Sequence, residues 1–286
     1  MTEASNNRKR LLLIGGGLVA LGVVAFIAFA VWFLQDDAPD EVAIDSAAAQ
    51  VAAGAETTDD TTSDTADDGT TDDTTTATDA PSTDGTTATT GADSTDAPAA
   101  DGDLSGTWSV DTSIGEFSFA DSTGTFVGFR VQEELSSIGS TTAVGRTPEV
   151  SGTLVIDGST ITEVSVEADM TSITTDDSRR DNRVQSALNT SENPTATFVL
   201  TSPITLDDAA FDGEPVTLDA AGELTINGVT QSVTFPLTAQ LVENTIVVVG
   251  SLDVVFADYD VEVPSAPIVV SAEDNGPIEL QLFFTR

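Results

Sequence analysis

The chain of 286 residues contains no cysteine and no histidine, which excludes disulfides, Cys/His zinc sites, thiol nucleophiles and catalytic triads built on histidine. Its 48 Asp and Glu residues outnumber nine Lys and Arg residues and give a formal net charge of −39. Because a phosphate backbone needs cations opposite it, this charge argues against a nucleic-acid partner.

The N-terminal residues have the pattern of a membrane anchor. Residues 1–10 are polar and end in Arg8-Lys9-Arg10, and the next 24 residues, Leu11–Leu34, carry no charge. At 1.5 Å per residue a helix over Leu11–Leu34 would be about 36 Å long, enough to cross a hydrocarbon core of about 30 Å. Basic residues before the run and Asp36 and Asp37 after it predict a single-pass helix in the cell membrane. Residues 1–10 would be cytoplasmic and the rest extracytoplasmic.

Two alternatives compete with a retained anchor. Ala28-Phe29-Ala30 resembles the cleavage site of a signal peptide, although the apolar run exceeds the usual length of about 7–15 residues and continues to Leu34. The other alternative is a buried helix of a soluble domain. We expect the retained transmembrane helix.

Residues 35–103 have the composition of a disordered linker. Thr, Asp, Ala, Ser and Gly dominate, and Val42, Ile44 and Val51 are nearly the only large apolar residues. Such a segment cannot bury enough apolar surface to offset its ordering entropy, so we expect an acidic, disordered stalk. A flexible chain of that length would span about 45 Å r.m.s.. Its threonines could also carry O-linked sugars.

Residues 104–286 show short alternating runs separated by turn residues, which predicts an antiparallel all-β domain, either a barrel or a sandwich. The best-defined hairpin is Gly222–Leu237, where Asn227-Gly228 separates two alternating runs and favours a type I′ turn. The expected runs are Trp108–Val110, Phe117–Phe119, Val127–Val131, Val150–Ile156, Val164–Met170, Phe198–Leu200, Val216–Ala220, that hairpin, Ile246–Phe256, Tyr259–Val263 and Ile278–Phe284.

The segment 174–190 breaks this alternation, and Asp177–Leu188 could form a helix or an ordered loop. It holds three of the six arginines that follow the apolar run: Arg179, Arg180 and Arg183. Because basic residues are scarce, these three could contact an anionic lipid headgroup at the mouth of a barrel. The alternative is local pairing with Asp176, Asp177 and Asp181.

Five short motifs, taken in order, resemble the YceI-like domain family over most of residues 104–286. They are Trp108-Ser109-Val110-Asp111, Ser172-Ile173-Thr174, Arg180-Asp181-Asn182 with Pro194–Phe198, the hairpin at 222–235, and Phe256-Ala257-Asp258-Tyr259. The chain departs from the family pattern at Arg183, where a histidine is common, and at Ala187-Leu188-Asn189, where a Phe-Phe pair is expected.

The resemblance implies an extended, lipocalin-like antiparallel barrel whose apolar tunnel holds a long isoprenoid or quinone-like lipid. No other cofactor and no metal are implied. The alternative is that the same inward-facing side chains fill a core without room for a ligand. The candidate lining residues are Phe117, Phe119, Phe129, Val131, Phe198, Phe235 and Phe256.

Enzyme activity is not expected. Without His or Cys, acid–base chemistry would fall to Asp, Glu or Tyr259, and no spacing singles out a pair of carboxylates. The sequence therefore predicts a membrane-anchored extracytoplasmic protein that stores, transports or sequesters a polyisoprenoid-like lipid. The alternative from another class is a structural or adhesive β-sandwich with a filled core.

Overall fold

The computed structural model describes residues 38–59, 103–136, 139–264 and 266–286. The predicted cytoplasmic residues 1–10, the predicted transmembrane helix Leu11–Leu34 and the linker residues 60–102 lie outside these ranges. Within the described ranges, no helix combines the length and the apolar character needed to cross a membrane.

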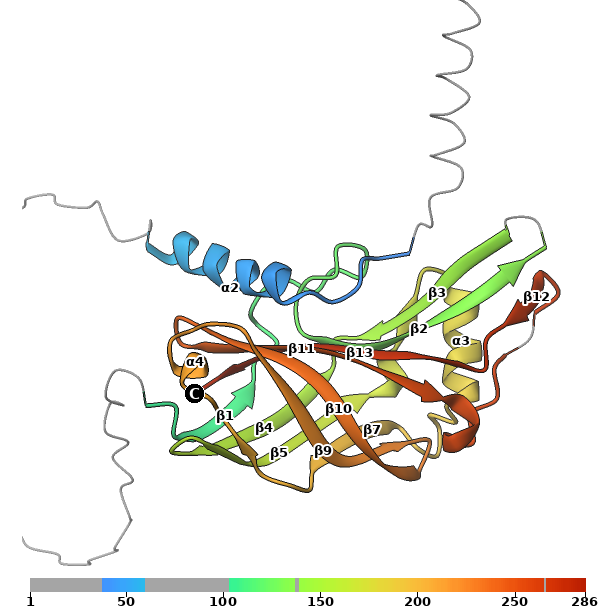
Figure 1. The fold of residues 1–286 in the computed structure, drawn as a ribbon. Coiled ribbons are helices and arrows are strands. Elements are labelled where there is room, and N and C mark those ends of the chain that lie inside the picture. The colour runs from blue at the N-terminus through green and yellow to red at the C-terminus, as the bar shows by residue number, and fades with distance from the viewer. Residues whose placement is uncertain (1–37, 60–102, 137–138, 265) are drawn as a thin grey trace, which may run out of the picture.

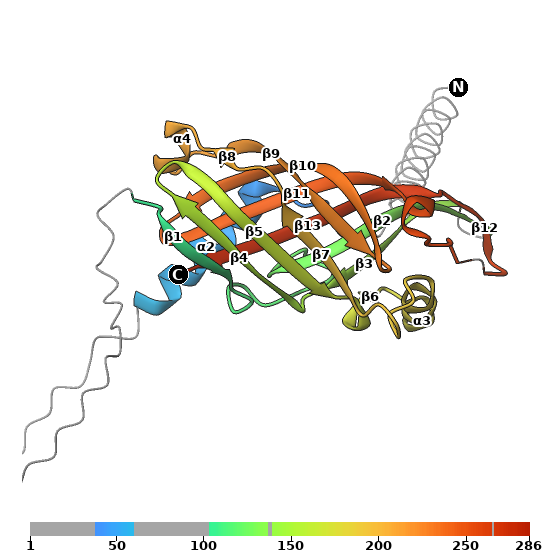
Figure 2. The same cartoon turned by 90° about the horizontal axis from the view of Figure 1, so that it is seen from below.

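A single antiparallel sheet closes on itself and forms a barrel (Figures 1 and 2). Closure occurs where the last strand pairs with the first, with Ser109 opposite Thr285 and Val110 opposite Phe284. The predicted barrel is therefore confirmed, and the alternative of a two-sheet sandwich is wrong. The strands around the ring are β1 (Gly106–Val110), β4 (Val150–Asp157), β5 (Thr160–Asp169), β7 (Thr195–Leu200), β9 (Val216–Ile226), β10 (Val229–Val242), β11 (Thr245–Val255) and β13 (Asn275–Thr285).

The strand β13 has two different neighbours along its length. Near its C-terminal end it pairs with β1, whereas Ile278–Gln281 pairs with β2. From this point the sheet continues beyond the ring and extends one end of the barrel (Figure 2). The strands of this extension are β2 (Phe126–Leu135), β3 (Gly139–Thr147), β6 (Thr174–Thr175) and β12 (Val269–Ala272), whereas β8 (Ile204–Thr205) pairs with β5.

The predicted Asn-Gly hairpin is confirmed. Asn227 and Gly228 have φ angles of 50° and 74°, as both central residues of a type I′ turn require. The strands β9 and β10 pair from Ile226 opposite Val229 to Val216 opposite Ala239.

Two predicted strands are wrong. Phe117–Phe119 lies in the long loop between β1 and β2, with one isolated bridge between Ser118 and Thr123. Tyr259–Val263 begins in the 3-10 helix η2 (Phe256–Tyr259) and continues without regular structure. In both places alternating side chains pack against other segments without forming a ladder.

Short helices lie at both ends of the barrel. Asp177–Leu188, left open between helix and loop, contains α3 (Ser178–Ala187), and the Asp177 carboxylate caps it by accepting a hydrogen bond from the backbone N–H of Arg179. α4 (Asp208–Phe211) lies at the opposite end (Figure 1). A further 3-10 helix, η1 (Met170–Ser172), follows β5.

The expectation of disorder throughout 35–103 is wrong for its first part. Residues Ile44–Asp59 form α2, which lies along the outside of the barrel near β11 and β13 (Figure 1). The few large apolar residues of this segment account for the order. Ala47 and Val51 are buried against Val247, Val249 and Phe283, with Val42 and Ile44 packed beside them. Tertiary burial here overrides a composition that favours disorder.

Candidate functional site

The barrel encloses a cavity of about 250 Å³. This far exceeds the space of one water molecule, about 30 Å³, so the interior is not close-packed. Along β9, the lining residues extend from Val216 to Ile226, which corresponds to about 33 Å of strand and about 25 Å of barrel axis at the usual tilt. The cavity is therefore elongated, and the alternative of a completely filled core is wrong.

The wall of the cavity is almost entirely apolar. Among the described residues that line it, none is Asp, Glu, Lys or Arg, and only Thr197, Gln240 and Tyr259 have polar side chains. Gln240 is already engaged, since its amide donates a hydrogen bond to the carbonyl of Gly213 at 3.1 Å. An ionic group placed in this cavity would be buried without a counter-charge, which costs several kcal/mol.

Tyr259 supplies the most deeply buried polar side chain of the wall, with 3% of its surface exposed. Asn227 holds its backbone by donating to the carbonyls of Tyr259 and Asp260, at 3.2 and 3.1 Å. Burial, and secondly the charge of Asp258, raise the pKa of Tyr259, so the hydroxyl stays protonated and can donate a hydrogen bond.

Five of the seven predicted lining residues are on the cavity wall. They are Phe129, Val131, Phe198, Phe235 and Phe256. Phe117 and Phe119 are not, because they belong to the loop that was wrongly predicted as a strand. The Phe117 ring packs on Phe126 at 6.4 Å between centroids, and the Phe119 ring lies 5.9 Å from the guanidinium of Arg146.

Glycines opposite aromatic rings help to preserve the cavity. Gly145 is directly opposite Phe129 in the ladder, and a Cβ built on Gly145 would lie 2.4 Å from the Phe129 ring. Gly222 is opposite Leu200 in the ladder, and a Cβ built on it would lie 2.4 Å from the nearby ring of Phe198. A larger residue at either glycine would displace the neighbouring phenylalanine ring toward the cavity and reduce the cavity volume.

The three candidate headgroup arginines lie on α3, and none of them lines the cavity. Arg180 forms an ion pair with Asp176, four residues before it, and a second ion pair with Glu133 of β2 at 2.6 Å. For Arg180 the structure therefore shows the alternative of local pairing. Asp181 instead accepts hydrogen bonds from the backbone and the hydroxyl of Thr175. Arg179 and Arg183 are exposed on the helix surface, and their contact with a headgroup stays a prediction.

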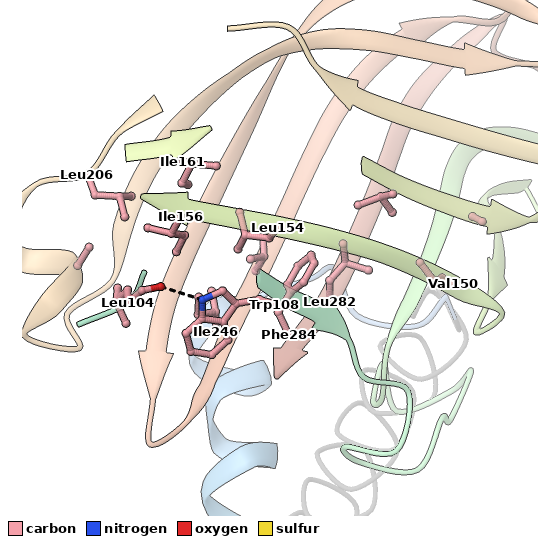
Figure 3. Close-up of a cluster of buried hydrophobic side chains, with 14 of the residues drawn as sticks. Leu104, Trp108, Val150, Leu154, Ile156, Ile161, Leu206, Ile246, Leu282 and Phe284 are labelled. Carbon is pink, nitrogen blue, oxygen red and sulfur yellow. Dashed lines mark hydrogen bonds between the residues drawn. The ribbon is translucent and has the colours of Figure 1, made fainter. Parts of the chain in front are cut away.

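The ends of the cavity include residues that the sequence analysis did not select. At one end α3 contributes Val184, Ala187 and Leu188, whose i, i+3, i+4 spacing in a polar segment is the signal that could have identified them. At the other end Leu104 and Leu206 belong to a buried cluster with Trp108 (Figure 3). The Trp108 indole donates to the Leu104 carbonyl at 2.9 Å and fixes the beginning of the domain there.

Solved structures with a similar arrangement include a polyisoprenoid-binding domain from Saccharophagus degradans. Its TM-score is 0.46 at 20% identity, and the alignment covers 62% of this chain and 97% of that one. Burkholderia cenocepacia BcnA has a TM-score of 0.46 at 18% identity, covering 61% and 98%.

Among curated sequences, protein YceI from Escherichia coli O157:H7 and from Shigella flexneri are each 36% identical over 113 residues. The alignment covers 38% of this chain and 53% of each relative, so it spans about half the length of these proteins. The YceI-like domain itself matches residues 119–284. Since this match covers more than half of the 286 residues, the chain belongs to the YceI-like domain family.

Proposed function

We propose that the barrel binds one elongated, uncharged, apolar molecule of the isoprenoid or isoprenoid-quinone class. The observation that carries this proposal is the elongated cavity whose lining contains no charged side chain among the described residues. Binding would come from apolar area removed from water, at about 0.8 kcal/mol for each CH₂-sized group, or about 4 kcal/mol gross for each five-carbon isoprene unit. The YceI-like resemblance implies the same class of ligand.

The protein stores, carries or sequesters this lipid and does not transform it. The polar groups of the wall are a tyrosine hydroxyl, a threonine hydroxyl and a glutamine amide that is already hydrogen-bonded. These groups can orient the head of a lipid, but they supply neither a general base nor an activated nucleophile. In the same proposal Leu11–Leu34 anchors the chain in the cell membrane, with the barrel on the extracytoplasmic side.

Lipid extraction followed by mass spectrometry tests this function on the full chain purified in detergent without added lipid. We expect one isoprenoid species in near-stoichiometric amount. The variant Ala239→Phe narrows the cavity and should lose this species. The control Thr217→Phe adds the same ring to the exposed face of the neighbouring strand and should keep it. A folded wild-type chain that retains no lipid and ignores added isoprenoids would contradict this function and favour a structural or adhesive role for the surface of the barrel.

A further inference from the structure

Residues 38–51, here called the strap, are fastened to the outside of the barrel by an apolar contact. Ala47 is 0% exposed and Val51 is 7% exposed, and both pack against Val247, Val249 and Phe283. The strap lies outside residues 119–284, the part that matches the YceI-like domain.

The beginning of the strap makes polar contacts with the outer face of β2 and β3. The Pro39 carbonyl accepts a hydrogen bond from Arg130 at 2.7 Å, and the Asp40 carbonyl accepts from Arg146 at 2.9 Å and from the Ser122 hydroxyl at 2.8 Å. Further along, the side chain of Gln50 accepts from the backbone N–H of Gly124 at 2.8 Å. Hydrogen bonds thus hold both the beginning and the end of the strap at defined positions on the barrel.

These carbonyls complete a buried ionic cluster. Arg146 and Glu279, whose side chains are 0% and 2% exposed, are 2.7 Å apart, and Arg130 lies 3.5 Å from the other oxygen of Glu279. Arg146 donates four hydrogen bonds: to Glu279, Phe119, Ser122 and, in the strap, Asp40. Removing the strap would leave buried cationic donors without acceptors, so the strap belongs to the folded domain.

The position of the strap in the sequence has a consequence for the proposed anchor. Leu34 ends the apolar run, and Ala38 begins the strap four residues later, so at most about 14 Å of extended chain separates them. A disordered stalk over residues 35–103 would instead allow the barrel to lie about 45 Å from the end of the apolar run.

We infer that the strap clamps the barrel directly onto the surface of the lipid bilayer, beside the point where the chain leaves the membrane. This rests on the membrane anchor proposed above. The strap reaches the barrel at Arg130, and the adjacent residues of β2, Phe129 and Val131, line the cavity. The wall of the binding site is thereby held close to the bilayer from which an isoprenoid would enter.

Cutting the chain between the strap and the barrel tests the clamp. A protease site is placed within residues 60–102, the full chain is reconstituted in phosphatidylcholine–phosphatidylglycerol vesicles, and the cut sample is sedimented. We expect more than about nine-tenths of the barrel fragment to sediment with the vesicles, because the strap holds it without a covalent link.

Two substitutions on the same helix make the test specific. Ala47→Asp places a carboxylate in the buried contact and should release the barrel fragment on cutting, whereas Ala49→Asp adds the same charge on an exposed position and should not. Release of the wild-type fragment on cutting would overturn the clamp and leave the anchor standing. An uncut chain that stays in the supernatant would overturn the anchor and, with it, the inferred position at the bilayer.

Discussion

Beside the strap, both faces of the sheet formed by β2, β3 and β13 carry buried side chains, but the chemistry of the two faces is opposite. On the inner face, Phe129 and Leu280 line an apolar cavity. On the outer face, one residue away along the same strands, Arg130 and Glu279 join Arg146 in an ionic cluster beneath the strap. No buried polar side-chain atom of the described residues is left without a hydrogen-bond partner.

The difference shows which buried region can accept a ligand. Beneath the strap, Arg146 donates hydrogen bonds to four residues, and its guanidinium lies 4.4 Å from the Phe126 ring, so the polar groups of this region are already engaged. Burial lowers the pKa of Arg146, while the charge of Glu279 opposes this shift. The cavity has the reverse character, with unfilled volume and almost no polar contacts. Its ligand must therefore be apolar.

The largest effect is expected from Glu279→Gln in the outer cluster. This change leaves two buried guanidinium groups without their anion and should destabilise the fold by about 3–5 kcal/mol. For a domain of this size the melting temperature would fall by about 6–20 °C, which circular dichroism can follow. Glu134→Gln, at an exposed position of β2, is the control and should change the melting temperature little. Equal melting temperatures for the two variants would show that the cluster does not stabilise the barrel.

A smaller effect is expected from Gly145→Ala on the inner face. The added methyl group would press on the Phe129 ring and drive it into the cavity, at a cost of about 1–3 kcal/mol in stability. Lost apolar contact should weaken isoprenoid binding by about 4- to 10-fold. Gly54→Ala meets no atom within 4 Å and should leave binding unchanged. Titration with a fluorescent isoprenoid measures both variants, and unchanged binding by Gly145→Ala would show that Phe129 does not contact the ligand.

Tyr259→Phe removes one hydroxyl from the wall and tests how the head of the ligand is held. For an isoprenoid with a carbonyl or hydroxyl head, the loss of one hydrogen bond should weaken binding by about 2- to 10-fold. A hydrocarbon isoprenoid without oxygen should bind both proteins equally. If both ligands lose affinity by the same factor, Tyr259 acts through packing and not through its hydroxyl.

The smallest effect is expected at Asp111, which joins the end of β1 to β13. Its carboxylate accepts hydrogen bonds from the hydroxyl and the backbone N–H of Ser113, at 2.6 and 2.8 Å, and from Thr285 at 3.1 Å. The hydroxyl of Ser113 is the main cause that lowers the pKa of Asp111 below 3.8.

A lowered pKa means that this stabilisation is present above about pH 4 and is lost as the pH falls through the folded-state pKa. Asp111→Asn should therefore lower the melting temperature by about 2 °C at pH 7, and the difference should shrink below pH 4. A difference that grows as the pH falls would have the wrong sign for this account.

Local sequence patterns predicted the antiparallel all-β domain because each hairpin carries its own turn and alternation, whereas the choice of a barrel over a sandwich came from the resemblance to the YceI-like family. Asn227-Gly228 fixes a register over eleven residue pairs without help from distant segments. Four of the five predicted residues that lie on the cavity wall, Phe129, Val131, Phe198 and Phe235, follow the same period of two, whereas Phe256 begins the 3-10 helix η2. Phe117 and Phe119 alternate just as regularly, but the loop between β1 and β2 has no neighbouring strand to pair with over that stretch.

The strap and the ionic cluster could not be predicted from local patterns, because their partners are far apart in the sequence. Asp40 meets Arg146 across 106 residues, and Arg146 meets Glu279 across 133. Val42, Ile44 and Val51 were visible as isolated apolar residues in a polar segment, yet their docking depends on the outer faces of β11 and β13. The average composition of residues 35–103 is dominated by the long polar part, so it does not reveal the short helix α2 at the beginning of the segment.

The most direct test of the central claim keeps the tail of the ligand constant and changes only its head. Farnesol and farnesyl pyrophosphate compete for the cavity against a fluorescent isoprenoid bound to the full chain. The uncharged wall predicts that farnesol displaces the probe and that the pyrophosphate binds more than about 100-fold more weakly, since its charge would be buried without a counter-ion. Equal or tighter binding of the pyrophosphate would contradict the account.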